Sequence, residues 1–334
     1  MGTKPHERCF LLSFIHNYQI IILMRKKILM TLVLAFAMSV GTYAQGTETV
    51  LEEGGTGPYK AVVYEVEGFA EHTIFAPKDL SVFNEKKPLP VLVWGNGGCA
   101  NSPRGHEKFL NDIASYGYLV LATGVMPKEE APRRMGMGMG MGSQSRSEQQ
   151  VESMDWAFQQ NADKNSPFYQ KIDTKNICIS GMSCGGLQAL FNCFDERVTS
   201  IMICNSGLFE QPEGDEGGPN ARRMPGMPSV PKKKLAEIHC PIIYILGGET
   251  DIAYANGMDD FKRIEHVPAI AVNLPVGHGG TYNQPHGGEF AIVARAWLDW
   301  QLKGNKEASK MFVGSNPAIL QRPDWTLEKN AKVQ

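Results

Sequence analysis

A serine stands between two glycines at residues 181–185, whose sequence is Gly-Met-Ser-Cys-Gly. The apolar residues 177–179 before it predict a buried strand, and residues 187–190 after it predict a helix. Glycines two residues before and after the serine allow a sharp turn between strand and helix, and the helix N-terminus then directs N–H groups at the reaction centre. Ser183 is therefore a candidate nucleophile, with a structural serine in a glycine-rich turn as the alternative.

A serine hydroxyl needs a base to remove its proton, and the base needs an acid that orients it. Two later strands, predicted over residues 241–246 and 269–274, are each followed by polar residues. Asp251 follows the first strand and His278 follows the second, so the chain order is Ser, Asp, His. Glu249 is the alternative acid. Taken singly, Asp251 could also be a turn former and His278 a loop residue.

With these three residues in this order, the chain resembles the α/β-hydrolase superfamily from about Tyr59 to Lys303. Within that superfamily, the pattern is similar to secreted esterases related to dienelactone hydrolase, to cutinase-like polyester hydrolases and to platelet-activating-factor acetylhydrolase. The resemblance implies that Ser183 is the nucleophile and that His278 is the general base and then the acid. It also implies that Asp251 orients the imidazole.

The resemblance further implies an oxyanion hole built from two backbone N–H groups. One is the N–H of Cys184, the residue after the serine. The other belongs to the loop after Trp94, where an Asn-Gly-Gly sequence starting at Asn96 replaces the family's His-Gly-x turn. Because the asparagine departs from that pattern, Gly98 and Cys99 both stay candidates for the second donor. A glycine turn without a catalytic role is the alternative.

Cys99 and Cys184 both lie at these expected donor positions. Two N–H groups that bind one oxygen bring their residues close together, and a disulfide spans a Cα separation of ~4.4–6.8 Å. We therefore hypothesise a Cys99–Cys184 disulfide, which export of the protein would permit. The alternative is a pair of free thiols, because convergent N–H groups do not require convergent side chains.

Strands and helices alternate along the chain, which predicts an α/β fold with a mostly parallel central sheet and helices on both faces. The expected strands cover residues 62–66, 72–75, 91–94, 118–122, 177–180, 200–204, 241–246 and 269–274. The expected helices cover residues 107–116, 151–160 and 289–302. We expect one catalytic domain over residues 45–334, with its ligand at the carboxyl ends of the strands.

Two segments at about residues 131–150 and 207–234 are expected to form surface loops at the mouth of the site. The first contains four Met-Gly pairs at residues 135–142. Methionine thioethers bind Cu(I), so a non-catalytic, exported copper-binding protein is one alternative. The composition favours a tolerated low-complexity insertion in a loop.

The first 44 residues predict a secretory signal, not a part of the fold. Residues 25–27 are basic, residues 28–40 are apolar, and Thr42 and Ala44 offer small side chains at positions −3 and −1 of a cleavage site. Met24 is a natural start, so the residues before it predict an over-extended N-terminus. The basic residues interrupt the apolar run, which falls short of a ~20-residue membrane span. We expect a secreted or periplasmic protein without a stable membrane anchor.

The composition is that of a globular protein, and the net charge of −2 gives no reason to expect a nucleic-acid partner. The sequence has no metal-binding His-x-His or His-Glu-x-x-His spacing, so we expect neither a metal nor an organic cofactor. The pattern favours a secreted serine esterase for small-molecule or polymer-linked esters, with Trp94, Met182 and Tyr282 shaping the substrate pocket. A serine peptidase of the same fold is the alternative enzyme.

Overall fold

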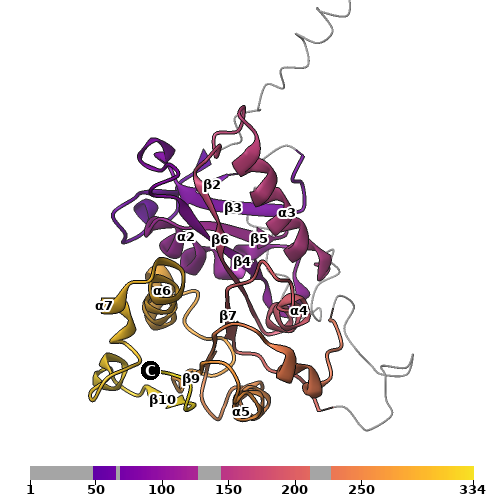
Figure 1. Ribbon diagram of the computed structural model, residues 1–334, viewed down its shortest axis with the longest axis vertical. Helices are drawn as coiled ribbons and strands as arrows, with labels where there is room; N and C mark the ends of the chain where they lie inside the picture. The colour runs from indigo at the N-terminus through magenta and orange to yellow at the C-terminus, as the bar shows by residue number, and fades with distance from the viewer. Residues whose placement is uncertain (1–47, 65–67, 127–143, 211–226) are drawn as a thin grey trace, which may run out of the picture. The chain divides into compact units, whose positions relative to one another are not determined.

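The computed structural model describes residues 48–64, 68–126, 144–210 and 227–334, which form a mixed β-sheet with helices on both faces (Figure 1). The strands are β1 (Glu48–Thr49), β2 (Ala61–Tyr64), β3 (His72–Pro77), β4 (Leu89–Gly95), β5 (Leu119–Thr123), β6 (Ile172–Met182), β7 (Ser200–Cys204), β8 (Ile242–Leu246), β9 (Ala269–Asn273) and β10 (Thr326–Lys329). The helices are α2 (Glu107–Ser115), α3 (Glu148–Ala162), α4 (Cys184–Asn192), α5 (Tyr254–Arg263), α6 (Gly288–Lys303) and α7 (Lys306–Ser309).

Within the described ranges, the strand order of the sheet is β1-β2-β3-β5-β4-β6-β7-β8-β9-β10. The strands from β5 to β9 in this order are mutually parallel, whereas the pairs at the two edges are antiparallel. The parallel strands are continuous apolar runs because both of their faces are covered, and every residue of β8 is buried. The α/β class and the mostly parallel sheet expected from the sequence are confirmed.

The strand order reverses at β4, which has β5 on one side and β6 on the other. The chain passes through α2 between β4 and β5, and through α3 between β5 and β6. Right-handed crossovers that run in opposite directions place their helices on opposite faces of the sheet. A crevice forms at such a reversal, outside the carboxyl ends of the strands. Ser183 follows β6 at this point.

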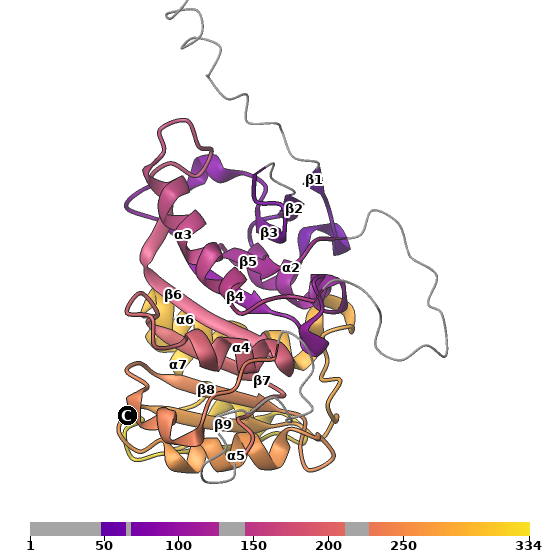
Figure 2. The same cartoon turned by 90° about the vertical axis from the view of Figure 1, so that its right-hand side faces the viewer.

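Two apolar cores lie between the sheet and its helices. On one face, α3, α4 and α5 pack against strand residues such as Val93 and Ile179. On the other face, α2 and α6 pack against Trp94 and Cys178. Figure 1 shows α2 and α6 to the left of the strands and α3 and α4 to the right, and Figure 2 shows α4 in front of the sheet with α6 behind it. The alternating side chains of each central strand therefore serve both cores.

The segment expected as a loop at about residues 131–150 ends earlier than the sequence indicated. Helix α3 already begins at Glu148, and Gln149 and Gln150 are fully buried. This corrects the expectation from the sequence, because polar glutamines indicate a loop but these two side chains are buried in the helix. Residues 127–143 and 211–226, which hold most of both expected loops, lie outside the described residues.

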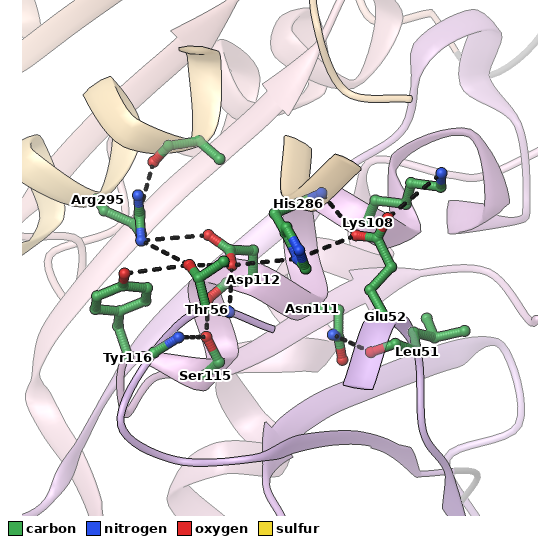
Figure 3. A network of polar contacts seen from close by, with 12 residues as sticks. Leu51, Glu52, Thr56, Lys108, Asn111, Asp112, Ser115, Tyr116, His286 and Arg295 are labelled. Carbon is green, nitrogen blue, oxygen red and sulfur yellow. Dashed lines mark hydrogen bonds and ion pairs between the residues drawn. The ribbon is translucent and has the colours of Figure 1, made fainter. Parts of the chain in front are cut away.

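Polar contacts fasten the segment before β2 to α2 and to the start of α6 (Figure 3). Asp112 on α2 accepts hydrogen bonds from the N–H and the hydroxyl of Thr56 at 2.8 and 2.7 Å. Its second carboxylate oxygen, Oδ2, lies 3.4 Å from Nη1 of Arg295 on α6. The Glu52 carboxylate accepts a hydrogen bond of 2.7 Å from the N–H of His286. The contact with His286 anchors the loop that follows β9 at its end nearest to α6.

Candidate active site

Ser183 lies on a strained turn between β6 and α4. Its backbone has φ 53° and ψ −116°, a conformation that residues with a Cβ rarely adopt. A Cβ at Gly181 would lie 2.3 Å from the carbonyl carbon of Gly185, and a Cβ at Gly185 would lie 2.0 Å from that of Gly95. Only glycine allows the helix to approach β6 and β4 so closely, which is the physical basis of the Gly-x-Ser-x-Gly sequence.

His278 lies between Ser183 and Asp251 at the carboxyl edge of the sheet. Its Nε2 is 2.9 Å from Ser183 Oγ, and its Nδ1 is 2.6 Å from Asp251 Oδ1. Ser183 follows β6, Asp251 follows β8 and His278 follows β9, so parallel strands bring the three residues together from distant parts of the chain. Glu249, the alternative acid, is exposed, and Asp251 is the carboxylate that the imidazole contacts.

The carboxylate of Asp251 is buried among hydrogen-bond donors. Oδ1 accepts from His278 and from the N–H of Ala253, while Oδ2 accepts from the N–H of Gly247 and from Nδ2 of Asn205. Burial by itself raises the pKa of Asp251, but these four hydrogen bonds outweigh it and lower the pKa below its usual value. An ionised carboxylate requires Nδ1 of the imidazole to donate, which leaves Nε2 as the acceptor for the serine hydroxyl.

The site opens to solvent on the side of the imidazole. The His278 side chain is 27% exposed, whereas that of Asp251 is fully buried. Ile252, directly after Asp251, is 81% exposed, and Val276, two residues before His278, is 41% exposed. Two exposed apolar side chains therefore lie within two residues of Asp251 and His278 along the chain.

The turn after β4 meets the start of α4. The N–H of Gly185 donates to the carbonyl oxygen of Asn96 at 3.0 Å. A disulfide joins Cys99 to Cys184, with the Cα atoms 5.2 Å apart, so the disulfide hypothesis is confirmed over the pair of free thiols. Gly98 and Cys99 both have a positive φ, and both stay candidates for a second donor beside Cys184. The N–H of Cys184 has no partner within its own helix, because it belongs to the first residue.

Trp94 and Tyr282 lie in the core and not at the wall of a pocket, which corrects the sequence interpretation. Trp94 is fully buried, with its ring centroid 5.2 Å from that of His106 and 6.1 Å from that of Tyr282. The Trp94 side chain thus packs in the core beneath the polar turn that follows β4. Met182 is 8% exposed, and its sulfur lies 2.4 Å from where a Cβ of Gly97 would be. Met182 therefore supports the turn after β4.

Two residues directly after β7 belong to the same cluster and were missed in the sequence. Asn205 donates to the Asp251 carboxylate at 2.8 Å, and the Ser206 hydroxyl donates to the carbonyl oxygen of Ser183 at 2.7 Å. The signal that could have found them also marks Asp251 and His278, namely a polar residue that follows a buried strand.

Within the described ranges, no group of three or more His, Cys, Asp or Glu side chains is arranged to hold a metal ion. The Met-Gly repeat and the expected signal sequence lie outside those ranges. In the part of the chain that the structure describes, no helix combines the length and the hydropathy needed to cross a membrane.

No protein-family model matches the chain, and a comparison with curated proteins finds no significant similarity. The function is therefore inferred from the geometry of the site.

Proposed function

We propose that this protein is a secreted serine esterase with the α/β-hydrolase fold. The observation that carries the proposal is the position of His278, whose two ring nitrogens are hydrogen-bonded to Ser183 and to Asp251. The strained serine turn and the disulfide-linked turn beside it support the proposal. So does the placement of the three residues after β6, β8 and β9, which agrees with the arrangement that the sequence resembles.

The reaction begins when Ser183 Oγ attacks the carbonyl carbon of the ester. His278 Nε2 accepts the hydroxyl proton as the new bond forms, and the ionised Asp251 stabilises the imidazolium. The N–H of Cys184, together with that of Gly98 or Cys99, stabilises the oxyanion. The imidazolium then donates its proton to the departing alcohol oxygen, which leaves an acyl-enzyme on the serine.

Water releases the acyl group in the second half of the reaction. His278 Nε2 accepts a proton from the water as its oxygen attacks the acyl carbon, and the same two N–H groups stabilise the second oxyanion. The imidazolium returns its proton to Ser183 Oγ, and the carboxylic acid leaves. The proposed steps use neither a metal ion nor an organic cofactor.

The proposed substrate is an ester with an apolar acyl or alcohol part, carried by a small molecule or a polymer. Ile252 and Val276 motivate this choice, because they expose apolar surface next to Asp251 and His278 along the chain. The Cys99–Cys184 disulfide supports an exported protein, since disulfides persist in oxidising compartments.

Hydrolysis of p-nitrophenyl esters of increasing acyl length tests the proposal. We expect kcat/KM to rise with chain length, because each buried methylene contributes about 0.8 kcal/mol. Ile252→Ser should weaken this rise, whereas Leu320→Ser, which changes another exposed apolar residue, should not. A wild-type protein that hydrolyses none of these esters would contradict the proposed activity.

A further inference from the structure

Asn205 lies at the carboxyl end of β7, between the strand that carries Ser183 and the strand that carries Asp251. The residue is fully buried and has φ 43°, a left-handed conformation that asparagine tolerates better than most residues. Its N–H donates to the carbonyl oxygen of Ile245 at 2.8 Å, which fixes the backbone against β8. The Asn205 side chain is thus held at the centre of the polar cluster.

The Asn205 amide contacts both loops that carry the base and the acid. Nδ2 donates to Asp251 Oδ2 at 2.8 Å and lies 3.4 Å from the carbonyl oxygen of Gly277, the residue before His278. Oδ1 accepts a hydrogen bond from the Tyr282 hydroxyl. One buried amide therefore links the loop after β8 to the loop after β9.

Aromatic packing holds Tyr282 in place. Its ring centroid lies 5.0 Å from that of His106, 5.2 Å from that of Phe109 and 5.4 Å from that of Phe290, all near-perpendicular. The packed ring holds the phenol hydroxyl beside Oδ1 of Asn205. Because the Asp251 carboxylate and the Gly277 carbonyl oxygen can only accept, they require the NH₂ group on their side, which leaves Oδ1 to accept from the phenol. In the reversed orientation, the amide oxygen would face the anionic carboxylate of Asp251.

We propose that Tyr282 and Asn205 form a positioning relay that holds Asp251 and the loop of His278 in the arrangement needed for proton transfer. The inference rests on the proposed esterase function. Neither residue touches a reacting atom, so both act through Asp251 and His278. The relay explains why a tyrosine of the core lies four residues after the histidine.

Two variants remove the relay at different points. Tyr282→Phe keeps the packed ring and removes only the hydroxyl, and Asn205→Gly removes the amide while allowing the positive φ. We expect kcat to fall about two- to tenfold in Tyr282→Phe and up to about 100-fold in Asn205→Gly. KM should stay within about twofold, because no substrate contact is lost.

Matched controls remove similar groups far from the site. Tyr118→Phe deletes a buried phenol hydroxyl that donates to Asp299, and Asn330→Gly deletes an amide that bridges the carbonyl oxygens of Ile264 and Val267. Both controls should lose stability to a similar degree and keep the wild-type kcat.

A second measurement needs no substrate. The proton between His278 Nδ1 and Asp251 should give a far-downfield ¹H NMR signal in the wild-type protein, and His278→Ala should abolish it. In Tyr282→Phe and Asn205→Gly this signal should shift or broaden, whereas both controls should leave it unchanged.

A wild-type kcat together with an unchanged downfield signal in both relay variants would overturn the relay, even in an active esterase. If the wild-type protein hydrolyses no ester but the signal responds as expected, the relay stands and the proposed function fails.

Discussion

Asp251 defines the chemistry that the site can perform, because four hydrogen-bond donors surround its buried carboxylate. Its lowered pKa keeps it ionised, so the imidazole must donate from Nδ1 and accept from Ser183 at Nε2. Glu249 is exposed and cannot replace this arrangement without a change of the loop. In the proposed reaction, a single carboxylate therefore fixes the direction of proton transfer.

Separate replacement of each acid by its amide tests whether Asp251 or Glu249 orients His278. We expect Asp251→Asn to lower kcat about 10⁴-fold, since an amide in this place favours the wrong tautomer of His278. Glu249→Gln should leave kcat within about twofold of the wild-type value. A larger loss in Glu249→Gln than in Asp251→Asn would show that the wrong acid has been named.

Ser183, Asp251 and His278 could be proposed together because each is a reactive type that follows an apolar run within five residues, in an informative order. Asn205 follows an equally clear strand, yet an asparagine after a strand has many structural roles and belongs to no motif. The burial of Trp94 and Tyr282 depends on contacts between segments nearly 190 residues apart, so no local pattern could reveal it.

Among the secondary-structure elements, β4 and α4 form the site together with the turn that follows β4. Gly95 and Gly185 allow close backbone contact, and the disulfide between Cys99 and Cys184 ties the turn to the start of the helix. Both cysteines are candidate donors of the oxyanion hole. The disulfide therefore holds the N–H of Cys184 close to the turn that offers Gly98 or Cys99 as the second proposed donor, before the substrate binds.

Replacement of both cysteines by serine tests the role of the disulfide. We expect the free energy of unfolding to fall by up to about 4.6 kcal/mol, as the model of loop closure gives for 85 residues. The kcat should fall by up to about 100-fold if one donor of the oxyanion hole is misplaced.

A reductant provides the control for this variant. Reductant should lower the kcat of the wild-type protein towards that of the double variant and leave the double variant unaffected. Wild-type activity in the double variant would contradict a role for the disulfide in the oxyanion hole.

The central strands and the helices α2, α3 and α6 follow from apolar runs and helical periodicity. The structure extends β4, β6, α3 and α6 and places the ends of the others within one residue of the expected bounds. Helix α5 and strand β10 carry weaker patterns. Gly257 lies within α5 and only part of that helix is buried, while β10 is a mostly exposed edge strand of polar sequence. Such elements form because β8 and β9 offer them a surface and hydrogen-bonding partners, which local sequence does not record.

For the molecule as a whole, an aromatic core on one face of the sheet supports the candidate active site. His106 is buried in this core between the rings of Trp94 and Tyr282, and burial lowers its pKa to about 4. The imidazole is therefore neutral in the folded protein at neutral pH. Its protonation couples the stability of the whole fold to pH.

Between pH 6.5 and 4, the unfolded chain binds a proton at His106 that the folded protein does not bind. The free energy of unfolding should therefore fall as the pH decreases through this window, by about 3 kcal/mol from this residue. Below pH 4 both states are protonated, and this residue adds no further loss.

Urea unfolding of the wild-type protein and of His106→Phe at several pH values measures the effect. The buried Asp260, whose pKa is raised to about 6, changes the stability with pH in the opposite direction. Because Asp260 is present in both proteins, its effect cancels in the difference between them, which isolates the contribution of His106. Equal dependence on pH in both proteins would refute the assignment.

Covalent labelling with a fluorophosphonate tests whether His278 activates Ser183 as a nucleophile. We expect one adduct per wild-type molecule, located on Ser183 by peptide mass spectrometry. Ser183→Ala should show no adduct and a loss of esterase activity of ~10⁴- to 10⁶-fold, and His278→Ala should react far more slowly. An adduct on another residue, or a Ser183→Ala variant with near-normal activity, would contradict the activation of Ser183 by His278.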